Sequence, residues 1–218
     1  AIRGARGNSN TVIIEEFIQF ELEITLLTIK QKSGETIFCD PIGHEQIGGD
    51  YQNSWQPASL NIKQLNQAQS IAKLITDNLG GVGLFGVEFF ITKNEVIFSE
   101  LSPRPHDTGL VTIISQNLSE FELHLRAILE LPIPNTIKSK PSSSKVILAT
   151  KSIKNVSYKG VEIALKDENT KILLFGKPCA HIGRRMGVAL STAKDIAESK
   201  RKANQAAKSI KVVEAIIT

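Results

Sequence analysis

Two glutamates on neighbouring predicted strands have the spacing that most suggests chemistry. The runs Val82–Thr92 and Glu95–Leu101 predict a β-hairpin with Asn94 at the centre of its turn, which places Glu88 opposite Glu100. Like charges about 5 Å apart at Cβ destabilise an antiparallel pair, so a shared proton, a nearby Arg or Lys, or a divalent cation must offset the repulsion. With no Cys or His beside them, two carboxylates on rigid strands suit a hard ion such as Mg²⁺. Two solvated surface glutamates are the alternative that this spacing leaves open.

The loop from Ser102 to Gly109 follows the second glutamate and adds three side chains able to do chemistry, Arg104, His106 and Asp107. Two prolines stiffen this loop. Arg104 suits a phosphate or a developing anion, and Asp107 suits a substrate amine. An ordinary turn with surface hydrogen bonds is the alternative for His106 and Asp107. No serine or cysteine nucleophile elbow accompanies them, which argues against a catalytic triad.

Basic residues beside glycines form a third candidate group, made of Lys177, Arg184 and Arg185. They lie near the ends of predicted strands. Because glycine lets an anion approach the backbone as closely as the side chain, we expect these cations to bind an anion. The basic run at 200–202 lies on a predicted helix and is interpreted as a solvated face.

An acidic and apolar segment near the start predicts a nucleotide-binding strand edge. It consists of Glu15, Glu16, Phe17 and Ile18, and Glu23 recurs on the next predicted strand. Backbone groups at such an edge can hydrogen-bond an adenine, and a carboxylate can accept hydrogen bonds from ribose hydroxyls. An edge strand protected by its charges is the alternative.

The elements that must position these side chains follow from hydrophobic periodicity and turn signals. Strands are predicted at 12–20, 22–29, 36–42, 82–92, 95–101, 146–151, 171–175, 187–192 and 212–217, and helices at 60–79, 119–131 and 193–209. We expect a polar loop at 43–57, Ser59 as the N-cap of the first helix, and Phe90 opposite Phe98 in the hairpin. This mixture predicts an α+β fold with a mostly antiparallel sheet and flanking helices.

The formal net charge of +4, with a pI near 9.0, combines two parts of opposite sign. Residues 1–144 hold 11 Lys and Arg against 16 Asp and Glu, a net of −5, whereas residues 145–218 hold 15 against 6, a net of +9. The basic part allows a non-enzymatic module that binds nucleic acid as an alternative function. However, aromatic residues are not interleaved with the basic ones, as single-stranded nucleic acid requires. We therefore expect no nucleic-acid partner.

Cysteine usage and hydropathy bear on location. Cys39 and Cys179 are far apart and have no Cys or His cluster around them, so neither a disulfide framework nor a zinc site is indicated. No apolar stretch approaches the roughly 20 residues of a membrane span, and no signal-peptide pattern begins the chain. We expect a cytoplasmic protein without a membrane partner.

Longer motifs follow one another along the chain, each occurring once. They are Val12–Glu15, Phe20–Thr28, Pro41–His44, Ser54–Pro57, Gly83–Glu88, Ile97–Glu100, Ser102–Gly109, Ile113–Phe121, Leu174–Pro178 and Arg184–Leu190. In this order they resemble the ATP-grasp enzymes of purine synthesis, and more specifically the formate-dependent phosphoribosylglycinamide formyltransferases. The ATP-grasp carboxylase of aminoimidazole ribonucleotide is the alternative within that group. It usually has Asn at the position of Asp107 and lacks the Ser-Trp-Gln-Pro segment.

The resemblance implies an ATP-grasp core followed by a small C-terminal β-rich subdomain. Residues 1–131 would form the ATP-grasp region with the end of its lid, 132–145 a connector, and 146–218 a substrate-binding subdomain. The family's Gly-rich loop and lysine, which close over the ATP phosphates, do not occur in this sequence. The resemblance therefore implies a C-terminal portion that is inactive alone.

The resemblance also implies the metal and nucleotide contacts. Glu88 and Glu100 match the family's Mg²⁺ ligands, and Ser102 stands where many ATP-grasp enzymes carry an additional Asn ligand. The segment from Glu15 to Ile18 matches the part that contacts adenine, and Glu23 matches the acid that binds ribose. ATP would be a co-substrate.

The substrate contacts are implied in the same way. Asp107, Lys177, Arg184 and Arg185 match residues that hold glycinamide ribonucleotide, and Arg104 matches an active-site arginine widespread in the superfamily. Arg104 and Asp107 would be the catalytic pair. The implied reaction converts formate and ATP to formyl phosphate, which the substrate amine attacks. A full-length member of the family would be a homodimer.

Overall fold

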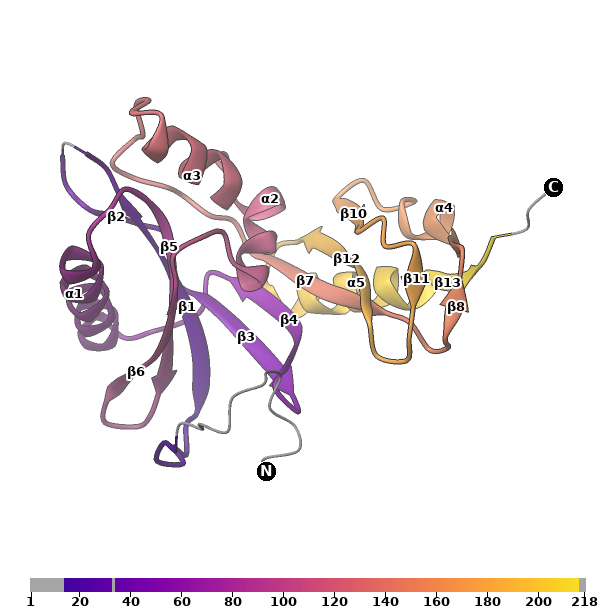
Figure 1. The fold of residues 1–218 in the computed structure, drawn as a ribbon, viewed down its shortest axis with the longest axis horizontal. Coiled ribbons are helices and arrows are strands. Elements are labelled where there is room, and N and C mark those ends of the chain that lie inside the picture. The colour runs from indigo at the N-terminus through magenta and orange to yellow at the C-terminus, as the bar shows by residue number, and fades with distance from the viewer. Residues whose placement is uncertain (1–13, 33, 216–218) are drawn as a thin grey trace.

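The structure is a computed structural model that describes residues 14–32 and 34–215. Its longest strands form one antiparallel sheet that runs through the molecule (Figure 1). In sheet order they are β10 (Thr170–Leu174), β12 (Arg185–Thr192), β7 (Ser142–Leu148), β4 (Asp50–Gln56), β3 (Ile42–Ile47), β1 (Leu22–Lys30), β5 (Gly83–Ile91) and β6 (Val96–Ser102). A short strand, β2 (Ile37–Phe38), also pairs with β1. The predicted α+β fold with a mostly antiparallel sheet is confirmed.

Helices and two small sheets complete the described structure. The helices are α1 (Ile62–Leu79), the 3₁₀ helix η2 (Asp107–Val111), α2 (Thr112–Ser115), α3 (Glu120–Ile128), α4 (Val161–Ala164) and α5 (Ile196–Ser209). The small sheets pair β8 (Ile153–Lys154) with β11 (Cys179–Ala180) and β9 (Val156–Lys159) with β13 (Lys211–Glu214). Among the described residues, no helix has both the length and the apolar run that crossing a membrane requires.

Two hydrophobic cores lie on opposite faces of β1 and β5, because successive side chains of a strand point to opposite faces. On one face, Ile24 packs in a cluster with Ala68 of α1. On the other face, Leu27 packs in a cluster with Leu123 of α3. Thr25 shares this second face with Leu27. The face beneath α3 thus changes from apolar to polar toward the start of β1, where the candidate site lies.

The predicted first helix is confirmed as α1, but its expected cap is wrong. Asn61, rather than Ser59, accepts a hydrogen bond from the backbone N–H of Gln64 at 2.9 Å. The Gln64 side chain in turn accepts from the Asn61 N–H at 3.1 Å. This reciprocal pair satisfies two donors at the helix start, which a serine two residues earlier does not reach. At the start of α3, Ser119 is the N-cap, and its side chain accepts a hydrogen bond from the N–H of Glu122.

The polar loop predicted at 43–57 is wrong, because these residues form the hairpin of β3 and β4. Gly48 and Gly49 make its turn with φ angles of +59° and +81°, a region that glycine enters without strain. β4 is polar although it lies between β3 and β7, because its inward side chains form hydrogen bonds instead of apolar contacts. Ser54 Oγ, for example, donates to the carbonyl oxygen of Thr108 at 2.8 Å.

Other element predictions differ from the structure mainly near the N-terminus. Residues 14–20, predicted as part of a strand at 12–20, have no regular secondary structure, and residues 12–13 lie outside the described ranges. The strand predicted at 36–42 is reduced to β2. The remaining predicted strands and helices are present with shifted ends, and the last predicted strand ends at Glu214 of β13. Six further short elements were not predicted, β8, β9, β11, η2, α2 and α4, since each spans at most five residues and shows no periodicity.

The predicted hairpin that carries the two glutamates is confirmed as β5 and β6, with one change of register. Its half next to Ser102 keeps the predicted pairing, whereas in the other half Phe89 rather than Phe90 lies opposite Phe98. The shift marks a β-bulge, and it falls where Glu88 lies on β5. The two glutamates therefore meet at a local distortion rather than in a regular ladder.

The C-terminal strands continue the same sheet. β7 begins at Ser142, within the residues predicted as a connector, and pairs with β4 on one side and β12 on the other. α5 packs on this part of the sheet through Ala206 and Ala207, which cluster with Ile147. The division of the chain at 131 and 146 stays a prediction.

Candidate active site

Two carboxylates and one imidazole meet at the bulge between β5 and β6. Glu88, Glu100 and His106 each place one donor atom within 4.8 Å of the others. Glu88 is only 8% exposed, whereas Glu100 is exposed. The structure brings together the two glutamates that the hairpin predicted. It also adds His106, although the sequence analysis placed no histidine beside them.

Hydrogen bonds from three elements fix the His106 ring. Thr108 Oγ1 donates to Thr25 Oγ1 of β1 at 2.8 Å, so it accepts the proton of His106 Nδ1, which lies 2.9 Å away. His106 Nε2 then lies 3.0 Å from Glu88 Oε1, within hydrogen-bond distance. Gly86 makes room for the ring, because a Cβ at that position would lie 3.0 Å from the Cβ of His106.

The charges of this cluster favour a bound cation. Burial, together with the nearby carboxylates of Glu100 and Glu23, raises the pKa of Glu88 to about 7. Burial lowers the pKa of His106, so the imidazole supplies little positive charge. Oxygen donors on two neighbouring strands, one of them buried and short of positive charge, fit a hard divalent ion such as Mg²⁺.

A buried carboxylate holds the loop that carries His106. Glu120, at the start of α3, has no exposed surface, and its Oε2 accepts the backbone N–H of His106 at 2.8 Å. Burial raises the pKa of Glu120 to about 8. Gly109 leaves space for this carboxylate, because a Cβ there would lie 2.1 Å from Oε2. This contact ties the loop to the helix that covers the sheet.

A cavity of about 200 Å³ opens beside the cluster, and five of the twelve predicted site residues line it. Its charged lining consists of Asp50, Glu88, Glu100, Arg104, His106, Asp107 and Arg185. Arg185 Nη1 of β12 donates to Asp107 Oδ2 of η2, so the chain brings together two residues that lie 78 positions apart. Arg104 Nη1 donates to the carbonyl oxygen of Pro105 at 3.0 Å. Carboxylates and guanidinium groups thus face one small space from different elements.

Lys177 and Arg184 lie beside this cavity rather than in its wall. Lys177 Nζ donates to the backbone carbonyl of Arg185 at 2.8 Å, and Arg184 Nη1 donates to the carbonyl of Cys179 at 2.8 Å. Burial lowers the pKa of Lys177, and the charges of Arg184 and Arg185 lower it further. The three predicted anion-binding cations are therefore close neighbours, of which only Arg185 reaches the cavity lining.

Of the predicted nucleotide contacts, the structure places Glu23 near the carboxylate cluster and the segment of residues 15–18 outside the sheet. Glu23 is half-buried on β1, opposite His44 of β3 and Phe90 of β5, and its charge acts on Glu88. The segment of Glu15, Glu16, Phe17 and Ile18 lies outside the sheet, and Phe17 is 87% exposed. The described structure therefore joins Glu23 to the cluster but not the segment before it.

Sequence reasoning missed several residues and contacts of this site. His106 was a candidate in the loop but had no predicted partner, Thr108 was not singled out, and Glu120 was treated only as part of a helix start. Tyr51, which lines the cavity, lay in a predicted loop. The Gly48-Gly49 dipeptide was the available signal for the hairpin that carries Tyr51. No local signal pointed to the contacts of Glu120.

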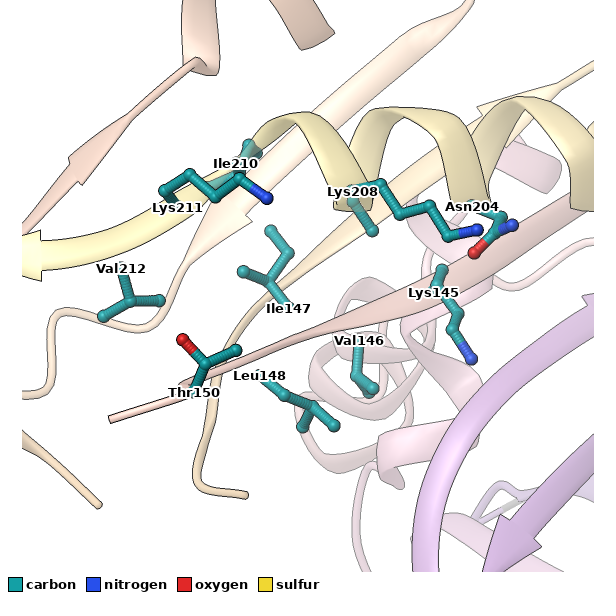
Figure 2. A pocket seen from close by; sticks show the side chains of 11 residues that line it. Lys145, Val146, Ile147, Leu148, Thr150, Asn204, Lys208, Ile210, Lys211 and Val212 are labelled. Carbon is teal, nitrogen blue, oxygen red and sulfur yellow. The ribbon is translucent and has the colours of Figure 1, made fainter. Parts of the chain in front are cut away.

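A larger cavity of about 430 Å³ lies between β7, α5 and β13 (Figure 2). Its lining combines aliphatic side chains with Lys145, Lys208 and Lys211, and it has no Asp or Glu. Lys145 and its neighbour Ser144 point to opposite faces of β7, and Ser144 hydrogen-bonds to Tyr51 at the site. This groove offers no carboxylate to a hard cation and lies on the other face of the sheet.

Comparison with family models matches nearly the whole chain in two parts. A model described as the ATP-grasp domain matches residues 1–121. A second model, described as PurT, C-terminal, matches residues 142–210. Both matched regions contribute to the lining of the small cavity, through Glu88 and Arg185.

Curated relatives with high identity have one name in common. The formate-dependent phosphoribosylglycinamide formyltransferase of Prochlorococcus marinus (strain MIT 9313) is 66% identical over 213 residues, which cover 98% of this chain and 55% of that protein. The protein of the same name from Synechococcus sp. (strain CC9902) is 63% identical over 214 residues, with the same coverage. The chain spans about half the length of the curated relatives it matches.

Solved structures with the same fold include two kinds of enzyme. N5-carboxyaminoimidazole ribonucleotide synthetase from Thermotoga maritima superposes with a TM-score of 0.81 at 30% identity, over 92% of this chain and 55% of that one. Glycinamide-RNase-transformylase T from Mycobacterium tuberculosis superposes with a TM-score of 0.74 at 31% identity, over 89% of this chain and 57% of that one. The fold is shared by both kinds.

Proposed function

Because the chain belongs to the ATP-grasp family, we propose that it is the metal-binding and substrate-binding part of a formate-dependent phosphoribosylglycinamide formyltransferase. In the proposed reaction, a formate oxygen attacks the γ-phosphorus of ATP, giving formyl phosphate and ADP. The amine of glycinamide ribonucleotide then attacks the formyl carbon, phosphate leaves, and the amine loses a proton. The observation that carries the proposal is the single cavity in which Glu88 and Glu100 face Arg104, Asp107 and Arg185.

Glu88 and Glu100 are the residues that would hold Mg²⁺. Bound there, the ion would neutralise charge on the ATP phosphates as the phosphoryl group moves. His106 would orient Glu88 through the contact of its Nε2 with Glu88 Oε1, and its own ring is fixed by Thr108. Catalysis by this part of the protein would then consist mostly of positioning and charge stabilisation.

Asp107 and Arg185 would bind different groups of the same substrate. The Asp107 carboxylate can accept hydrogen bonds from the substrate amine, and the Arg185 guanidinium can bind its phosphate. Lys177 and Arg184 add positive potential behind Arg185. Arg104, which lines the same cavity, would stabilise the charge of the developing formyl phosphate.

ATP would lie along the start of β1. Glu23 would accept from the ribose hydroxyls, and Glu15, Glu16, Phe17 and Ile18 would contact the adenine. The exposure of this last segment leaves its side chains and backbone open to a ligand.

The carboxylation of aminoimidazole ribonucleotide is the second candidate, and it is favoured by the TM-score of 0.81 with a synthetase of that kind. Identity favours the first candidate, at 66% against 30%. Asp107 also favours the first candidate. A carboxylate paired with Arg185 suits the aliphatic amine of glycinamide ribonucleotide better than the neutral side chain of Asn, which the carboxylase usually has at this position.

The test is a chimera that joins the upstream region of the Prochlorococcus marinus relative to this chain. We expect it to form ADP and formylated product from glycinamide ribonucleotide, formate and Mg-ATP. Turnover only with aminoimidazole ribonucleotide and bicarbonate would support the second candidate instead. The whole protein is proposed to be a cytoplasmic homodimer that binds no nucleic acid.

A further inference from the structure

Two different supports hold the Arg185 side chain at the cavity wall. Its guanidinium forms an ion pair with Asp107, and its Cζ lies 5.9 Å from the centre of the Tyr51 ring. A guanidinium within about 6 Å of an aromatic ring is attracted to the negative face of that ring. The side chain of Arg185 is about one-third exposed, at 32%, so it can still reach a ligand.

The Tyr51 ring is itself fixed from two strands. Tyr51 is only 7% exposed, and its hydroxyl lies 3.1 Å from Ser54 Oγ of β4 and in contact with Ser144 Oγ of β7. Its ring and hydroxyl therefore have separate tasks: the hydroxyl ties β4 to β7, while the ring faces the guanidinium from β12.

The two supports respond differently to a ligand that carries an amine and a phosphate. Asp107 neutralises Arg185, so an incoming phosphate must compete with that carboxylate, and an incoming amine draws the carboxylate away. The Tyr51 ring carries no net charge and needs no exchange of partners. It can hold Arg185 before and after the ligand binds.

We infer that Tyr51 is a positioning residue for substrate, whose ring keeps the Arg185 guanidinium aimed at the substrate phosphate once Asp107 turns to the amine. This inference rests on the proposed function, since it takes glycinamide ribonucleotide as the ligand. Tyr51 acts through Arg185 and is not a catalytic residue.

The experiment compares Tyr51→Leu with Tyr51→Phe in the chimera described above. Tyr51→Leu removes the ring, and we expect the Kd for glycinamide ribonucleotide, measured by calorimetry, to rise about three- to thirtyfold. The Kd for Mg-ATP should stay the same, and KM for the ribonucleotide should rise more than kcat falls. Tyr51→Phe keeps the ring but loses both serine contacts, so its Tm should fall while its Kd for the ribonucleotide stays near that of the parent chimera.

An Arg185→Met background separates positioning from general damage to the site. If the ring acts through Arg185, Tyr51→Leu should cause no further loss of affinity there. Equal affinities of the Leu and Phe variants, or an undiminished effect in the Met background, would overturn the inference while the proposed function stands. Failure of the unsubstituted chimera to bind glycinamide ribonucleotide would overturn both.

Discussion

At the residue scale, the site depends on carboxylates that the fold holds in poorly solvated positions. Glu88 lies almost fully buried beside Glu100 and Glu23, and its pKa of about 7 reflects that crowding. Burial disfavours the negative charge of Glu88, and it also strengthens the attraction between the Glu88 carboxylate and a cation. In a buried site, solvent screens both the repulsion between carboxylates and their attraction for the cation only weakly. A site of this kind is unfavourable when empty and favours a divalent ion.

Removing one of the two proposed ligands tests the metal site. Glu100→Gln keeps the size of the side chain, but a neutral amide binds Mg²⁺ poorly. We expect turnover of the chimera to fall on the order of 10²-fold or more, the loss typical of a group that stabilises transition-state charge. We also expect weaker binding of Mn²⁺, followed by electron paramagnetic resonance. Glu95→Gln on the hairpin turn is the matched control, and normal Mg-ATP-dependent turnover of Glu100→Gln would refute the assignment.

Glu120 should make stability depend on pH. Its pKa is about 8 in the folded chain, against about 4.3 for an unfolded glutamate, so the folded state holds the extra proton between these values. The stability contributed by that proton is fully present below about pH 4.3 and is lost as the pH rises toward 8. Glu120→Gln should remove this loss.

Denaturant titrations of the parent chain and of Glu120→Gln at pH 5 and pH 8, with chelator present, measure the effect. Glu88 titrates in both proteins, so its contribution cancels in the comparison. The free energy of unfolding should fall less between the two pH values in the variant. An identical fall in both proteins would show that Glu120 titrates as an ordinary surface glutamate.

At the element scale, irregularities rather than regular pairing create the site. The bulge in the β5–β6 hairpin brings two residues of β6 opposite one of β5, and it lies where Glu88 and Glu100 meet. η2 follows at once and returns Asp107 and Thr108 over the sheet. α3 then fixes this short segment through Glu120. One hairpin and one short helix therefore hold most of the acidic side of the cavity.

The start of α1 offers a direct comparison of two candidate caps. Asn61→Ala removes the reciprocal contact with Gln64 and should lower the free energy of unfolding by about 1 kcal/mol. Ser59→Ala, two residues earlier, should change it by much less, because Ser59 is exposed and makes no capping bond in the described structure. Denaturant melts of both variants measure the difference. A larger loss for Ser59→Ala would mean that the helix begins earlier than described.

At the scale of the whole molecule, the net charge of +4 is the sum of an acidic N-terminal part and a basic C-terminal part with different proposed roles. The acidic part carries the carboxylates proposed to need a cation, and the basic part carries the cations proposed to need a phosphate. The continuous sheet brings residues of both parts to one cavity, because β4 and β7 pair across the two matched regions. Other lysines lie on the opposite face, in the groove beside α5.

Reversing charges in that groove tests whether the basic part acts as a nucleic-acid module. We expect the unsubstituted chain to retard no single-stranded or double-stranded nucleic acid at low salt in a mobility-shift assay. We also expect Lys145→Glu, Lys208→Glu and Lys211→Glu together to leave turnover of the chimera unchanged. Salt-sensitive binding that this triple substitution abolishes would support the alternative function.

Local sequence was sufficient for a large part of this protein. The hairpin of β5 and β6 and the helices α1 and α3 follow from periodicity and turn signals within about 20 residues, so short-range contacts determine them. The proximity of Glu88 and Glu100 follows from the hairpin alone. Only its register was wrong in part, because a bulge adds one residue without a clear sequence signal.

The remaining features were decided by tertiary structure. The contact of Arg185 with Asp107 and that of Tyr51 with Ser144 join residues 78 and 93 positions apart. Such contacts exist because β4 pairs with β7, and β7 with β12. Those pairings form because these strands together bury surface and satisfy the hydrogen bonds of polar groups such as Ser54. The strands are far apart in the sequence, so no local sequence pattern predicts which of them pair. The sequence determined which residues could do the chemistry, and the sheet decided which of them face one cavity.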